Sequence, residues 1–443
     1  MAEGHMNGLK FEFEWEDPQG AKGSELRATW ARLKIIVGDT PVTRLLDARS
    51  HSVRDAVYCP LYPLAEWLAT RWWFLLQEVE SPGTDRQRTY RERHSLLYAR
   101  EGFALPDLEL CPSGQEVALR WKALNLPGSR IRFLEEGGAT LEAKAVQDEL
   151  ERFITSVKSR LDADGVSGTL LHDEWDSIEQ CGTEERQFCE AAAAMGLDPY
   201  ALDADMQRLI TNACQDLPKE LAADFFSVAD AQQISDQVRS LNESLNHIRH
   251  LSVNLGGLVD LRRNRPVVDY SLQPWRQGYE FARAFRAQLG MNGGILGSLA
   301  SIGQAVGVDP TVLNGVILSE PASASFLDAL VGTNEQGSPG FVLNKRREDA
   351  RRFVFCRALF EYLTAGTHDT AALVSAAHSD RQKRNRAFAA EFLAPAALLK
   401  ERMQSGTVDE EQLGDLAEEF VVSTRVIQHQ MENHHLAALI PAY

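Results

Sequence analysis

Apolar and polar side chains alternate at two-residue spacing in the first part of the chain. This alternation predicts half-buried strands over residues 9–15, 30–37, 108–111, 116–124 and 130–134. Between them, residues 64–76 repeat large apolar side chains at helical spacing, which predicts one largely buried helix. We therefore expect an α+β domain over residues 7–141.

The apolar period changes to 3.6 residues from about residue 141 onward. Residues 146–161 carry an apolar stripe that predicts a long amphipathic helix. Further helical patterns cover residues 184–195, 203–213, 218–226 and 229–251. A polar segment that contains proline, residues 263–266, separates this part from the rest of the chain. We expect a helical middle region over residues 142–268.

The C-terminal part mixes both patterns. Helices are expected over residues 274–289, 346–363 and 381–392. Short apolar runs predict strands near residues 316–318, 326–331 and 341–343. The fold class that follows is α+β and helix-rich, with a C-terminal domain over residues 269–443.

Composition restricts the classes of function. The 443 residues include 46 Lys and Arg against 63 Asp and Glu, a formal charge of −17, and 44% of them are hydrophobic. This is typical of a folded globular protein, and the acidic charge does not indicate a nucleic-acid partner, whose phosphates require a basic surface. No apolar run approaches the roughly 20 residues that span a bilayer, so no membrane partner is expected. The six cysteines form no C-x-x-C pair, which favours reduced thiols and a cytoplasmic location.

Three blocks of residues stand out in the C-terminal part. Residues 351–363 read RRFVFCRALFEYL, residues 382–395 read QKRNRAFAAEFLAP, and residues 416–423 read LAEEFVVS. In this order they resemble three motifs of the ImmA/IrrE family of bacterial metallopeptidases: the zinc-motif helix R-x-F-x-x-A-H-E-x-G-H-x-L, the helix E-x-E-A-N-x-F-A-A-x-L-L-M-P and the tail L-A-x-x-F-x-V-S. The resemblance covers about residues 270–435 and implies a zincin-like fold for this domain.

The positions that bind zinc in that family carry other residues here. The resemblance implies two zinc-binding histidines one helical turn apart, a general-base glutamate between them and a third ligand from the second helix. In this chain the histidine positions are Arg357 and Glu361, and the general-base position is Ala358. The two positions for the third ligand are Gln382 and Arg384. Guanidinium groups do not coordinate cations, so we expect no metal, no cofactor and no catalytic residue at this site.

Two interpretations of Arg357, Glu361 and Arg384 remain open. In the first, Arg357 pairs with Glu361 at i, i+4 spacing, Arg384 lies opposite them, and the group fills the former zinc site as a structural ion network. In the second, the three residues form a cleft that binds an anionic ligand or a protein partner. The second interpretation draws on the local charge, because residues 341–402 carry 12 Lys and Arg against 7 Asp and Glu.

Other histidines leave room for a displaced metal site. The candidates are His247, His250, His368, His378, His434 and His435. The enzyme alternatives are therefore a metallopeptidase with a displaced metal site, or a hydrolase whose unrecognised active site lies in the N-terminal or middle region.

The function expected from the altered motif is not enzymatic. As the resemblance implies, active relatives cleave repressor or antitoxin partners. A copy without zinc ligands is expected to act as a binding, sensing or regulatory module with a protein partner, in bacterial stress response, phage defence or control of mobile elements.

Overall fold

The structure, a computed structural model, describes residues 8–439 except 19, 81–83, 126–128, 254, 271, 292, 320–325, 367–368 and 404–405. It divides into two compact units, here called the N-terminal unit (up to Gln207) and the C-terminal unit (from Arg208). About half of the residues lie in helices and several small sheets complete the chain, so the α+β, helix-rich class is confirmed. No helix among the described residues has the length and apolar character needed to cross a membrane.

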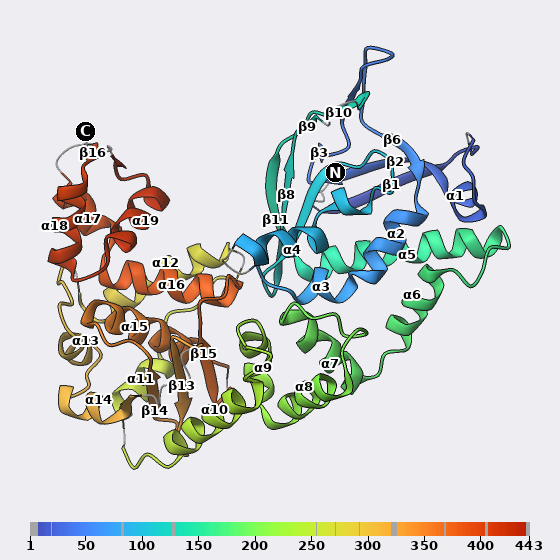
Figure 1. Ribbon diagram of the computed structural model, residues 1–443. Coiled ribbons are helices and arrows are strands. Elements are labelled where there is room, and N and C mark those ends of the chain that lie inside the picture. Colours follow the sequence, from blue (N-terminus) through green and yellow to red (C-terminus); the bar gives the residue numbers. More distant parts are fainter. Residues whose placement is uncertain are drawn as a thin grey trace, which may run out of the picture. The chain divides into compact units, whose positions relative to one another are not determined.

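The N-terminal unit contains three small antiparallel sheets and a set of helices (Figure 1). The first sheet contains β1 (Leu9–Trp15), β2 (Trp30–Val37), β3 (Thr40–Pro41) and β6 (Val57–Pro60). The second has the order β5 (Ser52–Arg54), β4 (Leu45–Asp47), β10 (Ile131–Phe133), β9 (Leu124–Asn125), and the third β11 (Gly137–Glu142), β8 (Glu116–Lys122), β7 (Asp107–Pro112). The helices are α1 (Ser24–Ala28), α2 (Tyr62–Thr70), α3 (Trp72–Gln77), α4 (Thr84–His94), α5 (Ala143–Ala163), α6 (Leu170–Gln180) and α7 (Thr183–Ala194), with a 3₁₀ turn at Leu96–Ala99.

Two expectations for this part are corrected. The single helix expected over residues 64–76 is two helices, α2 and α3, because Arg71 between them leaves the helical conformation with φ −108° and ψ 8°. The predicted boundary between residues 7–141 and 142–268 is also absent, since α5 belongs to the core of the N-terminal unit. Phe153 of α5 lies 4.7 Å from the ring of Phe11 on β1, so the apolar stripe of this helix is buried by the first sheet.

The C-terminal unit is built around a four-stranded sheet with the order β12 (Ile317–Ser319), β14 (Pro339–Leu343), β13 (Ala329–Thr333), β15 (Ala371–Val374). β12 pairs with β14 in parallel and the other pairs are antiparallel. Its helices are α9 (Lys219–Phe226), α10 (Ile234–Arg249), α11 (Gly256–Arg263), α12 (Pro274–Gln288), α13 (Leu299–Ala305), α14 (Pro310–Val316), α15 (Glu348–Thr364), α16 (Asp380–Leu393), α17 (Ala396–Arg402), α18 (Glu410–Phe420) and α19 (Thr424–His434). α8 (Ala204–Asp216) crosses the boundary between the units, and β16 (Thr407–Val408) pairs with β17 (Ala438–Leu439).

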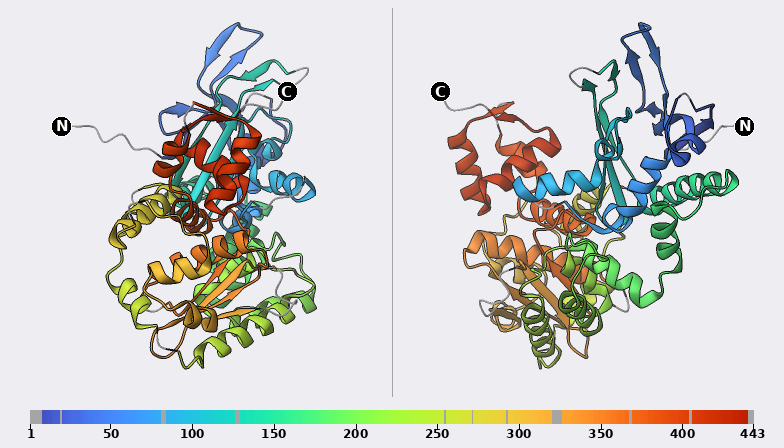
Figure 2. Two further views of the ribbon diagram at one scale, coloured as in Figure 1. Left: turned by 90° about the vertical axis from the view of Figure 1, so that its left-hand side faces the viewer. Right: turned by 45° about the vertical axis from the view of Figure 1, so that its right-hand side comes forward.

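Helices cover both faces of this sheet (Figures 1 and 2). On one face, Phe341 of β14 packs 5.0 Å from Phe355 of α15. On the other, Gly332 and Gly340 lie opposite each other in the sheet and both approach Ile248 of α10 so closely that a Cβ atom would crowd it. Coverage on both faces explains why the strands are apolar along their whole length.

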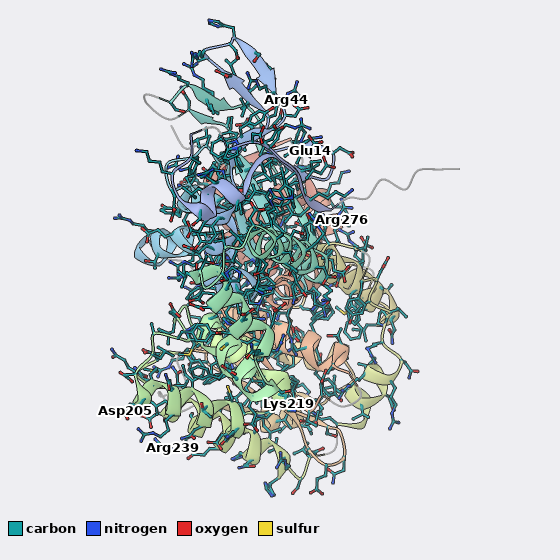
Figure 3. All side chains as sticks on the ribbon, turned by 90° about the vertical axis from the view of Figure 1, so that its right-hand side faces the viewer. Glu14, Arg44, Asp205, Lys219, Arg239 and Arg276 are labelled. Carbon is teal, nitrogen blue, oxygen red and sulfur yellow. The ribbon has the colours of Figure 1, made fainter. Side chains whose placement is uncertain are left out.

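The role of α10 corrects the expected division at residue 268. The middle region of residues 142–268 is shared between the two units, because α10 and α11 bury their apolar sides against the C-terminal sheet and α15. The opposite side of α10 is polar, and Arg239 extends from it into solvent (Figure 3). The separate domain of residues 269–443 is therefore replaced by a unit that begins about 60 residues earlier.

Gly278 fixes the distance at which α12 crosses α16. A Cβ atom at this position would overlap the carbonyl oxygen of Arg384 and lie 2.9 Å from the backbone nitrogen of Phe388. Both atoms belong to the α16 backbone, so a larger residue would force the two helices apart. Only glycine permits this approach.

Gly278→Ala is expected to lower the free energy of unfolding by about 1–3 kcal/mol, because overpacking outweighs the better helix propensity of alanine. The matched control is Gly414→Ala in α18, where an added Cβ would meet no atom within 4 Å. That substitution should raise the free energy of unfolding by up to about 1 kcal/mol. Urea denaturation of both variants measures the difference, and a gain in stability from Gly278→Ala would contradict the close crossing.

Candidate functional site

The two helices expected to carry the altered zinc motif are present as α15 and α16. They pack against each other, and the rings of Phe360 and Phe388 lie 5.1 Å apart between them. Ala358, at the general-base position, is fully buried in the apolar core of the unit. Polar side chains of the two helices also meet, at the positions that the resemblance assigns to zinc: Arg357 and Glu361 of α15 contact Gln382 and Asn385 of α16.

Arg357 lies at the centre of this polar interface. Its Nε donates to Asn385 Oδ1 at 2.7 Å, and its Nη1 donates to Asp328 Oδ2 at 2.8 Å. Its Nη2 donates to the carbonyl oxygen of Ser375 at 2.7 Å and to Gln382 Oε1 at 2.8 Å. Only 4% of the side chain is exposed. The guanidinium thus has acceptors on α16, after β15 and before β13, and is buried with its hydrogen bonds made.

Glu361 lies one helical turn further along α15 and has different partners. Its Oε2 accepts from Arg381 Nε at 2.7 Å, and its Oε1 accepts from Asn385 Nδ2 at 2.8 Å. Arg381 Nη1 also donates to Asp224 Oδ2 at 3.1 Å, and Gln382 Nε2 donates to Asp224 Oδ1 at 3.1 Å. The network therefore extends to α9, which carries Asp224.

The structure corrects the expected convergence of Arg357, Glu361 and Arg384. Arg357 pairs with Asp328, and Glu361 pairs with Arg381, so the i, i+4 pair is not formed. Arg384 lies outside the network. Its Nη1 donates to Gln277 Oε1 of α12 at 3.3 Å, and its guanidinium lies 5.7 Å from the centre of the Tyr270 ring. Arg384 is two residues after Gln382, and in a helix of 3.6 residues per turn it therefore lies on the opposite side of α16.

Charge and burial shift the pKa values of the groups in this network in different directions. Burial lowers the pKa of Arg357, although Asp328 opposes this shift. Burial alone would raise the pKa of Asp328, but Arg357 and Lys345 outweigh it and hold the pKa below its ordinary value. Burial raises the pKa of Asp224 even beside Arg381. Acidic side chains outnumber basic ones at the α9 end of the network, where Glu361 and Asp224 share Arg381. Basic side chains outnumber acidic ones at the other end, where Lys345 and Arg357 share Asp328.

The structure gives no support to a displaced metal site in the part of the chain it describes, where no group of three or more His, Cys, Asp or Glu residues could hold a metal ion. His378 is exposed, and His434 packs 4.5 Å from the ring of Tyr279. His368 lies outside the described residues.

One cluster in the N-terminal unit has the order of a catalytic triad. Thr169 Oγ1 lies 2.7 Å from His172 Nδ1, and His172 Nε2 lies 3.1 Å from Asp162 Oδ1. Thr169 directly precedes α6 and His172 is the third residue of that helix, so the contact joins two side chains at the first turn of α6. Both residues are buried. We assign this cluster a structural role.

Sequence reasoning did not identify four members of the network: Asp224, Asp328, Arg381 and Asn385. Asp224 contacts Gln382 across 158 positions of the chain, and no local pattern indicates such a contact. The sequence does contain a pattern that indicates Arg381 and Asn385. They are four positions apart and lie with Gln382 on one face of α16. On a helix in which Gln382 faces the network, Arg384 is two residues further on and faces away from it.

Comparisons with known proteins do not place the chain in a family. No family model, no curated protein and no solved structure matches it. The resemblance of the three blocks rests on their residues and order alone.

Arg357→Ala is expected to lower the free energy of unfolding by roughly 3–5 kcal/mol, because Asp328 keeps only the half-exposed Lys345 as a cationic partner and the buried Asn385 Oδ1 loses its donor. Arg384→Ala removes the same charge from the side of α16 that faces α12, where its contacts are only partly buried, and should cost less than about 1 kcal/mol. Chemical denaturation of both variants checks this. Losses of equal size would contradict the central position of Arg357.

Asp328 should make stability depend on pH in the acid range. Its pKa is lowered in the folded state, so its contribution is complete above the ordinary value of 3.8 and is lost as the pH falls through the folded value. Asp328→Asn should therefore be less stable than the unmodified protein at neutral pH. The difference should shrink as the pH falls below about 3.8, which denaturation curves across that range measure. A difference that does not change with pH would contradict the pairing with Arg357.

Proposed function

We propose that the C-terminal part of the chain is a catalytically inactive ImmA/IrrE-like domain with a zincin-like fold, and that it binds a partner without cleaving it. The order of the three resembling blocks supports this proposal. So does the placement of the first two blocks on α15 and α16, whose polar faces meet as the two ligand-bearing helices of a zinc peptidase must.

The observation that carries the proposal is the state of Arg357. A zinc ion at this position would need lone pairs from the residues at 357, 361 and 382 or 384. Arg357 instead offers a fixed positive charge, and its donors are held by Asn385, Asp328, Ser375 and Gln382. A dication beside this guanidinium would be repelled, and Glu361 is already paired with Arg381.

The biological setting follows from the resemblance. Active relatives act on repressor or antitoxin proteins, so we propose a cytoplasmic binding, sensing or regulatory module in bacterial stress response, phage defence or control of mobile elements. Its partner is proposed to be a protein, and an anionic ligand is compatible with the basic end of the network.

The protein, purified in the presence of zinc and then dialysed, is expected to hold much less than one zinc ion per chain. The reason is that Arg357 and Glu361 occupy the two histidine positions: a guanidinium group cannot coordinate zinc, and the carboxylate of Glu361 is already paired with Arg381. Elemental analysis measures the metal content directly. About one zinc per chain, reduced by Glu361→Gln, would overturn the proposal of an inactive site.

A further inference from the structure

Arg386 is a largely covered cation that lies beside the network without a carboxylate of its own. It is on α16, one helical turn after Gln382, and therefore on the same side of the helix. Its Nη2 donates to the carbonyl oxygens of Ser375 at 3.1 Å and Ala377 at 2.7 Å. Among the described residues, no Asp or Glu forms an ion pair with it.

The surroundings of Arg386 are positively charged. Arg357 Nη2 donates to the same carbonyl oxygen of Ser375, so two guanidinium groups meet at one oxygen atom. The nearby carboxylate of Asp328 is already occupied, because Lys345 holds its Oδ1 and Arg357 its Oδ2, each at 2.8 Å. Lys345 and Arg357 therefore take up the one carboxylate, and Arg386 is a third cation that does not pair with it. Arg425 on α19 adds a further positive charge that acts on Arg386.

This arrangement disfavours the charge on Arg386. Burial and the charge of Arg357 lower its pKa to about 9, in contrast to Arg381, whose pKa Glu361 raises. A buried cation without a counterion is costly, and a bound anion would remove that cost. The remaining donors of the guanidinium, Nε and Nη1, have no acceptor among the described residues, and the side chain is partly exposed.

We propose that Arg386 binds a phosphate group, with the positive charge of Arg425 acting on the same position. The local excess of two positive charges from Lys345, Arg357 and Arg386 over Asp328 matches a phosphate, which carries about −1.5 to −2 at neutral pH. A planar guanidinium with two free donors is suited to bind two oxygen atoms of one phosphate. The inference rests on the proposed function, because it names the class of ligand for the binding module.

The test is thermal unfolding of the full chain with inorganic phosphate, at neutral pH and at constant ionic strength adjusted with sodium chloride. Phosphate should raise the midpoint temperature of the unmodified protein in a concentration-dependent way. Arg386→Met should bind phosphate at least about tenfold more weakly, since it removes the charged fork. Without phosphate this variant should be as stable as the unmodified protein or more so, because it removes an uncompensated charge.

The matched control is Arg384→Met, two residues away on α16, which removes the same charge on the side facing α12. It should keep the full phosphate response. An equal loss in both variants, or a full response in Arg386→Met, would overturn the proposal, and so would a larger shift with acetate than with phosphate. If Arg386→Met does not fold, Arg425→Gln takes its place, because Arg425 is exposed: a weakened response supports the site and an unchanged response refutes it.

The two proposals fail separately. The metal content of the unmodified protein does not depend on Arg386, so a phosphate response that fails leaves the inactive-site proposal intact. Zinc bound at the motif would overturn the proposed function even if phosphate binds.

Discussion

The buried guanidinium of Arg357 is the constraint on which the C-terminal unit depends. A charge removed from water must have its hydrogen bonds made by protein groups, and those groups must be held in place. Arg357 takes its acceptors from α16, from the residue after β15 and from the segment before β13. One side chain of α15 thus ties together the sheet edge and the second helix.

The network built around it is uneven in charge, and the proposed class of ligand rests on this unevenness. Near α9, the carboxylates of Glu361 and Asp224 share Arg381. Near Asp328 the ratio is reversed, because Lys345 and Arg357 already occupy the one carboxylate and Arg386 is left with backbone carbonyls only. A cation is therefore unfavourable at the position that the resemblance assigns to zinc, and the phosphate site proposed above is the neighbouring position.

Sequence patterns predict the elements of this region but not its connections. The apolar spacing was sufficient for α15, α16 and the α+β class, since each depends on local periodicity. The predicted pairing of Arg357 with Glu361 is wrong. A helix offers each side chain several possible partners, and contacts with residues far away in the sequence, such as Asp328 and Asp224, determine which of them is used. The division at residue 268 failed for a similar reason: the apolar side of α10 does not reveal which sheet will bury it.

The apolar contacts that hold the helices together and the polar network are separable, so the residues of the network can change without loss of the fold. α12, α15 and α16 are joined by the rings of Phe281, Phe360 and Phe388, which lie 5.1–5.8 Å from one another. Gly278 sets the crossing of α12 and α16 on the side of α16 that carries Arg384. Neither contact involves the polar face with Gln382 and its neighbours. That face can therefore accommodate buried charges without disturbing the helix packing, provided that each charge has a partner. Among the described residues, Arg386 has no carboxylate partner.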